Sequence, residues 1–145
     1  VIENGLFYQN NATAFGSAIF GETKRLTIKN ATFSNNIVSG SAAIYITTFV
    51  GNNSEIRNSI IYGNSSAVNQ INSGNNVSYS IIEGGYSGIG NIASDPLFVN
   101  PVSNNYRLQS GSPAINAATI TGATSTDIVQ GIRACTPDMG AYEFQ

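Results

Sequence analysis

The chain has 145 residues, the size of a single domain, with 41% hydrophobic residues, only 10% charged residues and a formal net charge of −2. A fair apolar fraction with little charge argues against disorder, and one adjacent basic pair, Lys24-Arg25, is no footprint for nucleic acid. No apolar run approaches the ~18 residues of a membrane span. The single cysteine, Cys135, excludes a disulfide within the chain, and we interpret it as a small buried side chain.

From the first residues onward, the sequence repeats itself. The segments "IENGLFYQN", "IKNATFSNN", "IRNSIIYGN" and "VSYSIIEGG" start at residues 2, 28, 56 and 77. They share an aliphatic column formed by Ile2, Ile28, Ile56 and Val77. A second column contains Asn4, Asn30 and Asn58, with Tyr79 in the fourth copy, and a third contains Phe7, Phe33, Ile61 and Ile82.

Each repeat continues into a turn of small residues followed by a short apolar strand, as in "GSAIF" (16–20) and "GSAAIY" (40–45). We therefore expect three short strands per repeat and no helix, because no segment has an apolar period of 3.6. Repeats of 20–30 residues made of short strands predict an all-β parallel β-helix, a solenoid of about four rungs over residues 1–94. A β-sandwich is the alternative, but a sandwich needs no steady columns.

Stacking of equivalent strands at ~4.8 Å places like residues above one another. The aliphatic and large apolar columns should then fill the interior of the coil. The Asn column should occupy sharp bends, with Asn30 inside the coil and each amide bonded to the Asn of the next rung. The column Glu3–Lys29–Arg57–Ser78 should face outward, with Glu3 and Lys29 forming an ion pair.

The repeats stop near Asp95, and two motif-rich segments follow, "DPLFVNPVSNNYRLQSGSPAINAA" (95–118) and "TDIVQGIRACTPDMGAYEF" (126–144). They resemble the C-terminal part of the choice-of-anchor family of bacterial right-handed β-helix proteins, although Asn116 and Ala118 replace the Asp and Gly of that family's pattern. The "FYQN…GSAIF" units more weakly resemble repeats of polymorphic outer-membrane proteins.

The resemblance implies a right-handed coil whose last rung is covered by a C-terminal cap over residues 95–145. Its motif positions are Asp95, Pro96, Ser112, Pro113, Asp127, Arg133, Asp138 and Glu143. It also implies secretion to the surface of a bacterium with an outer membrane, and an anchoring or sorting module that follows the cap. Because the chain begins inside a motif, we expect further rungs of the same parent protein before Val1.

The cap carboxylates have two interpretations. Asp127 with Arg133, and Asp138 with Glu143, could form salt bridges or bind Ca²⁺, and pairing is favoured because the spacing of a calcium loop is missing. We expect Arg133 to hold the cap together through a carboxylate or carbonyl groups. No cofactor is expected.

Three functions stay open at this stage. The first is a non-catalytic, adhesin-like stalk that joins upstream rungs to an anchor at the outer membrane. The second is part of a polysaccharide-active enzyme, which is disfavoured because half of the acidic residues lie in the cap motifs and the chain has no histidine. The third is a carbohydrate-binding module that contacts surface glycans through tyrosines, for which Tyr8, Tyr45 and Tyr62 are the candidates.

Overall fold

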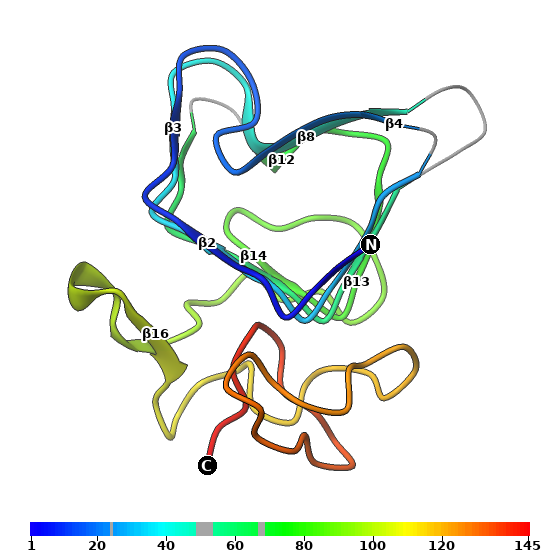
Figure 1. Cartoon of the computed structure of the whole chain (residues 1–145), viewed down its shortest axis with the longest axis vertical. Helices are drawn as coiled ribbons and strands as arrows, with labels where there is room; N and C mark the ends of the chain where they lie inside the picture. The colour runs from blue at the N-terminus through cyan, green and yellow to red at the C-terminus, as the bar shows by residue number, and fades with distance from the viewer. Residues whose placement is uncertain (24, 49–53, 67–68) are drawn as a thin grey trace.

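The computed structural model describes residues 1–23, 25–48, 54–66 and 69–145. It is an all-β chain coiled into a parallel β-helix, as the repeats predict (Figure 1). The first sheet contains β1 (Ile2–Glu3), β5 (Thr27–Lys29), β9 (Glu55–Arg57) and β13 (Asn76–Ser78). The second contains β2 (Leu6–Tyr8), β6 (Thr32–Ser34), β10 (Ile60–Ile61) and β14 (Ile81–Ile82).

Two shorter sheets complete the coil. The third contains β3 (Asn11–Ala12), β7 (Ile37–Val38) and β11 (Ser65–Ser66). The fourth contains β4 (Ile19–Thr23), β8 (Ala42–Thr48) and β12 (Asn69–Ile71). A full rung therefore has four strands, not the three that we expected. The third sheet was missed because a strand of two residues is too short to show alternation.

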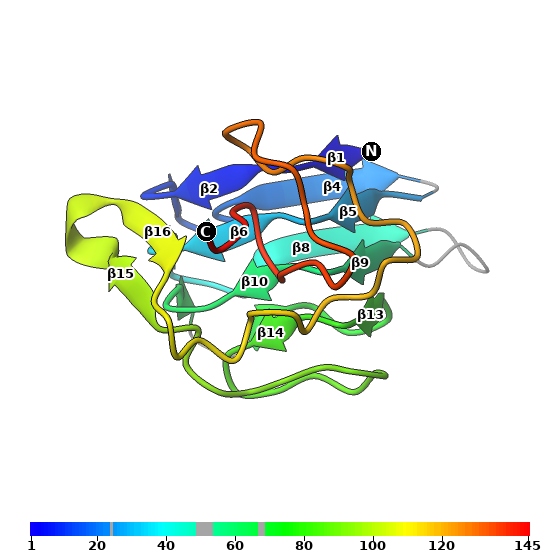
Figure 2. The same cartoon turned by 90° about the horizontal axis from the view of Figure 1, so that it is seen from below.

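The coil is right-handed. Followed from β1 to β4, the chain runs clockwise in Figure 1. Figure 2 places the first rung on the side that faces the viewer of Figure 1, so the clockwise path recedes from that viewer. All pairs between rungs are parallel, which excludes the β-sandwich, whose sheets are antiparallel.

The interior is built from the two apolar columns in the register that the repeats predict. Ile2 pairs with Ile28, Ile28 with Ile56, and Ile56 with Val77. Phe7 pairs with Phe33, Phe33 with Ile61, and Ile61 with Ile82. The rings of Phe7 and Phe33 stack with centroids 4.7 Å apart. Each rung thus adds like side chains to a continuous core, which is the source of stability in a solenoid.

The expected C-terminal cap needs correction, because a different segment closes the coil. After β14 the chain crosses the last rung, where Ile82 N donates to Ile92 O and Ile92 N donates to Ser80 O, both at 2.9 Å. Tyr86 packs against the core and donates its hydroxyl to Asn72 O at 3.3 Å. The end of the core is therefore covered by residues that we had assigned to the rungs.

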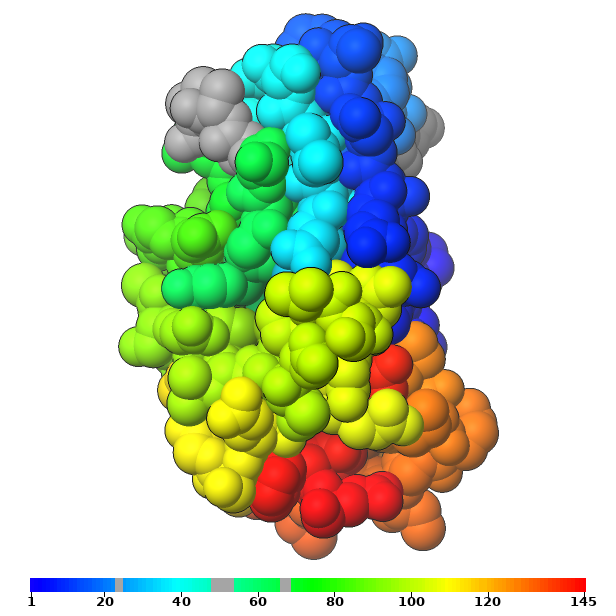
Figure 3. All heavy atoms as spheres, turned by 90° about the vertical axis from the view of Figure 1, so that its left-hand side faces the viewer, coloured from blue at the N-terminus to red at the C-terminus, as the bar shows by residue number. Residues whose placement is uncertain are grey.

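Residues 95–145, here called the flank segment, lie along the side of the coil against the second sheet and cross several rungs (Figures 2 and 3). The segment has one antiparallel pair, β15 (Phe98–Asn100) and β16 (Asn105–Leu108), joined by the 3₁₀ helix η1 (Pro101–Ser103). A second core forms beneath it. Its buried members are Ile60, Ile81, Phe98, Tyr106, Leu108, Ala114 and Met139.

Candidate functional site

The first Asn column connects the coil to the flank segment. Asn4, Asn30 and Asn58 have φ angles of 51°, 48° and 53°, in the left-handed region that Asn tolerates. Asn58 Nδ2 donates to Thr119 O at 2.8 Å, and Thr119 N donates back to Asn58 Oδ1 at 3.0 Å. Asn58 is fully buried by this contact. The side chain thus binds both the N–H and the C=O group of one residue of the flank segment.

The same column repeats the contact along the coil. Thr124 N donates to Asn30 Oδ1 at 3.2 Å, and Asn4 Nδ2 donates to Thr126 O at 2.8 Å. The expectation that Asn30 lies inside the coil and bonds to the next Asn is therefore wrong. A left-handed residue at the bend directs its side chain away from the core, and the flank segment buries it from outside.

The amide ladder that we expected forms instead in a second Asn column, which contains Asn10, Asn36 and Asn64. Asn10 Nδ2 donates to Asn36 Oδ1, and Asn36 Nδ2 donates to Asn64 Oδ1, both at 2.8 Å. Asn64 Nδ2 continues the row to Gln70 Oε1 at 2.8 Å. Asn36 is fully buried, so this row satisfies polar groups within the stacked bends.

Arg133 holds the flank segment together, in the role that the sequence predicts. Its Nη1 donates to Glu143 Oε2 at 2.9 Å, and its Nη2 donates to Gly140 O at 2.9 Å. Nη2 also reaches Asn4 Oδ1 in the first rung at 3.2 Å, and Nε donates to Thr124 Oγ1 at 3.2 Å. Burial lowers the pKa of Arg133, and the Glu143 carboxylate opposes that shift. The planar guanidinium thus joins three stretches of chain through separate donors.

The two expected pairings, Asp127 with Arg133 and Asp138 with Glu143, do not form among the described residues, because Arg133 pairs with Glu143. Asp127 Oδ1 accepts from Val129 N and Gly131 N, and its Oδ2 accepts from Glu143 N at 3.1 Å. Asp138 accepts from Asn116 N at 2.7 Å and Phe144 N at 2.6 Å. Burial raises the pKa of Asp138. Both aspartates order turns of the flank segment through backbone N–H groups.

The remaining cap motif residues shape local turns. Asp95 Oδ1 accepts from Leu97 N at 2.8 Å. Ser112 donates its hydroxyl to Pro96 O and accepts from Ala114 N at 3.1 Å. Pro113 lies half-buried between these residues. All of these contacts are internal to the flank segment.

The outward charged column forms as expected and contains one ion pair along the axis. Lys29 pairs in register with Glu3 and Arg57, and its Nζ lies 3.1 Å from Glu3 Oε1. Arg57 forms an ion pair with Glu55 and donates to Thr121 O of the flank segment at 3.0 Å. The column is therefore a mixed-charge surface that also touches the flank segment.

One hollow is bordered by two carboxylates, as hydrolytic chemistry would need. Asp127 and Glu143 line a space of about 270 Å³ beside Arg107 and Val129. The Glu143 oxygens accept from Arg133, Ala134 N and Asp138 N, however, and those of Asp127 accept from three backbone N–H groups. Each carboxylate therefore accepts three hydrogen bonds that hold turns of the flank segment in place.

The three candidate tyrosines do not share one surface. The ring of Tyr8 packs 5.5 Å from that of Tyr106, and Tyr62 belongs to the core beneath the flank segment, where burial raises its pKa. Only Tyr45 joins an exposed aromatic group, with Phe15 and Phe20. Both phenylalanines lie outside the set of tyrosines that the sequence suggested.

Other sequence interpretations have these outcomes. Cys135 is exposed and not buried, which corrects our interpretation. Within the described ranges, no group of three or more His, Cys, Asp or Glu residues is placed to hold a metal ion. The described residues also include no helix of the length and apolarity that a membrane span requires.

Comparison with known proteins gives no family. No family model, no curated protein and no solved structure matches the chain.

Proposed function

We propose that the chain is a non-catalytic segment of a secreted, adhesin-like surface stalk, as the tail's resemblance to the choice-of-anchor family implies. One observation carries the proposal: the flank segment bonds to the Asn column of three successive rungs. In a solenoid each rung otherwise contacts only its neighbours, so its rungs can open one at a time. A strap across three rungs couples their opening, and this suits an element that bears load.

The use of the carboxylates supports a structural role over catalysis. Those of the flank segment accept backbone N–H groups or pair with Arg133. In the rungs, Glu3 pairs with Lys29, and Glu83 accepts from Gly63 N and Gln70. Polysaccharide cleavage needs an acid and a base that exchange protons with the substrate. The carboxylates named here already accept hydrogen bonds or form ion pairs within the fold.

The open side of the first rung supports continuation of the stalk. Strands β1, β2, β3 and β4 each stand at the edge of their sheet. Unpaired edges are pairing templates that proteins normally cover. In this proposal, further rungs of the same polypeptide pair with them, and an anchoring or sorting module attaches the protein to an outer membrane.

Antibodies raised against the purified chain test the location. Intact cells of the producing organism should be labelled as strongly as permeabilised cells, and protease treatment of intact cells should remove the label. Labelling that requires permeabilisation would overturn the proposal.

A second assay tests the absence of catalysis. The purified chain, incubated with neutral and uronic-acid polysaccharides, should release no reducing ends or unsaturated products. Product release that disappears in Lys29→Ala or Arg57→Ala would instead assign catalysis to the outward charged column.

A further inference from the structure

The outer face of the fourth sheet presents an aromatic group that stays exposed among the described residues. Phe20 on β4 pairs in register with Tyr45 on β8. Their neighbours Ile19 and Ile44 pack into the core, so strand alternation directs Phe20 and Tyr45 outward. Figure 1 shows this sheet on the side of the coil opposite the flank segment, which therefore leaves the face open.

The three rings form one cluster. Those of Phe20 and Tyr45 are inclined by 15° with centroids 6.0 Å apart, and the ring of Phe15 lies 4.8 Å from that of Tyr45. Phe15 is 49% exposed and Phe20 is 54% exposed. The rings of Phe15 and Phe20 therefore keep about half of their surface available to a ligand.

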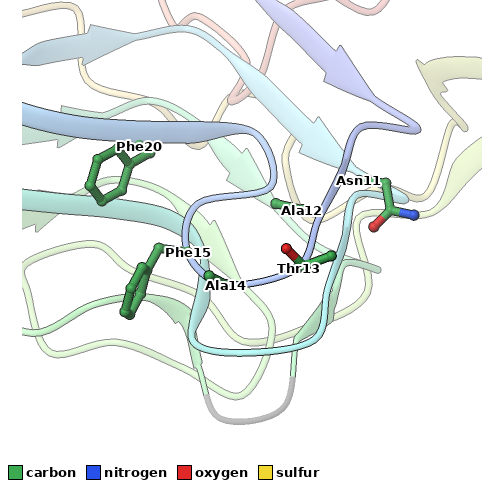
Figure 4. Close-up of a pocket in the computed structure, with 6 residues that line it drawn as sticks. All are labelled: Asn11, Ala12, Thr13, Ala14, Phe15 and Phe20. Carbon is green, nitrogen blue, oxygen red and sulfur yellow. The ribbon is translucent and has the colours of Figure 1, made fainter.

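Polar groups lie along the loop that leads to the rings. Phe15 and Phe20 line a hollow of about 630 Å³ together with residues 11–14 (Figure 4). The exposed side chains of Asn11 and Thr13 border it and have no hydrogen-bond partner in the part of the chain that the structure describes. Asn10, Asn36 and Asn64, by contrast, are bonded in the amide ladder. Figure 4 shows Asn11 at the end of the lining loop away from the rings, with Thr13 between them, so the free amide and hydroxyl would meet further units of an oligosaccharide whose first ring packs on Phe15 and Phe20.

From this juxtaposition we propose that Phe15, Phe20 and Tyr45, with Asn11 and Thr13, bind a neutral saccharide. A sugar ring has an apolar C–H face that packs on aromatic rings and hydroxyl groups that bond to an amide and a hydroxyl. None of the residues that line the hollow is charged, and the one charged residue of β4, the exposed Glu22, would repel an acidic sugar.

The size of the patch favours a small ligand over a second copy of the chain. An aromatic side chain offers ~150–250 Å², so two rings that are half exposed and a third that is less exposed offer at most roughly 300 Å². A stable protein interface needs about 800 Å² from each partner. The inference does not depend on where the protein resides, because binding is measured on the purified chain and can fail while surface labelling succeeds.

Affinity electrophoresis provides the first test. The purified chain is run through native gels that contain galactomannan, xylan or hydroxyethyl cellulose, with alginate as the anionic comparison. We expect a neutral polysaccharide to retard the chain, Phe20→Ala to weaken the apparent affinity about tenfold or more, and Asn11→Ala to weaken it less. Phe144→Ala is the matched control, because Phe144 is an exposed phenylalanine (41%) on the flank segment, and it should leave the retardation unchanged.

A second variant keeps the test independent of folding losses. The chain has no tryptophan, so Phe20→Trp introduces a single fluorophore into the proposed site. Its emission should change on titration with oligosaccharides of the retarding polymer, while far-UV circular dichroism stays that of the wild type.

Four results would overturn the proposal. They are absence of retardation by every neutral polymer, retardation by alginate alone, retardation that survives Phe15→Ala/Phe20→Ala, and a dimer in light scattering that Phe20→Ala converts to monomer. The last result would assign the patch to a second copy.

Discussion

Replacement of Asn58 separates the two roles of the first Asn column, its backbone conformation and its side-chain bonds. Asn58→Gly keeps the left-handed conformation easily but loses both bonds to Thr119. Each hydrogen bond contributes about 0.5–1.5 kcal/mol, so Asn58→Gly should lower the free energy of unfolding by roughly 1–3 kcal/mol. Asn58→Ala loses the same bonds and keeps a Cβ in the left-handed region, which costs about 1–2 kcal/mol relative to Gly there, for a total of roughly 2–5 kcal/mol.

The measurement is urea unfolding followed by far-UV circular dichroism, with the free energies compared at unchanged m-values. Asn76 is the matched control, because it is exposed, lies on β13 and is not among the residues with positive φ. There, Gly should cost about 0.5–1 kcal/mol more than Ala, the usual order for a strand. At Asn58 the order should reverse. If Asn58→Ala is no more destabilising than Asn58→Gly, the assigned role of the left-handed bend is wrong.

Further perturbations test the flank segment and the stacking of rungs. Arg133→Lys should lower the free energy of unfolding by about 3 kcal/mol or more, because an ammonium cannot replace the separate donors of a guanidinium. In this variant, amide hydrogen exchange should become faster in residues 95–145 before it becomes faster in the rungs. Burial raises the folded-state pKa of Asp138, so its contribution to stability is full below the unfolded-state pKa of about 3.9 and falls as pH rises through the raised pKa. The free energy of unfolding of the wild type, relative to that of Asp138→Asn, should therefore decrease as pH rises from the unfolded-state pKa to the raised pKa. An increase over this pH range would contradict the raised pKa of Asp138. Gly40→Ala should destabilise the protein by about 2 kcal/mol or more in thermal denaturation, because the new Cβ would meet the carbonyl of Ala14 in the previous rung. Gly21→Ala is the control, because the new Cβ there has open space around it, and it should be neutral or stabilising by up to ~1 kcal/mol.

The core of the coil could be predicted from the sequence because it depends on residue type alone. A column such as Phe7–Phe33 is recognisable wherever like apolar residues recur at the rung period, and the structure pairs them in that register. The roles of the two Asn columns could not be predicted in the same way. Asn4 and Asn10 are the same residue at similar bends, and the sign of φ decides which side chain leaves the coil.

The φ angles also show which feature of the sequence could have distinguished the two Asn columns. In the second bend the left-handed position precedes the ladder residue and contains Gln9, Asn35 and Gly63. A position that contains Asn in one rung and Gly in the next is typical of positive φ. The residue that follows this position can then keep a negative φ. Asn36 could have been assigned to the ladder on that basis. The first column offers no such substitution, since its fourth member is Tyr79, which is also left-handed.

The sequence of the second sheet also indicates that a further segment covers its outer face. A strand with one face in solvent alternates apolar and polar residues, but the second sheet contains adjacent apolar pairs such as Leu6-Phe7, Ile60-Ile61 and Ile81-Ile82. Such runs are typical of sheets covered on both faces. The inner member of each pair fills the coil and the outer member packs under the flank segment.

The one polar member of that outer row supports the same conclusion. Thr32 replaces an aliphatic residue in the second rung, yet it is only 1% exposed. Its Oγ1 accepts from Ala141 N of the flank segment at 3.0 Å, at the point where Gly140 N donates to Asn58 O in the third rung at 2.8 Å. A hydroxyl occurs in the apolar row where the covering chain presents an N–H group that would otherwise be buried without a partner. The rungs and the flank segment therefore match one another residue by residue, which explains why the repeats carry a second apolar row that an isolated coil would not need.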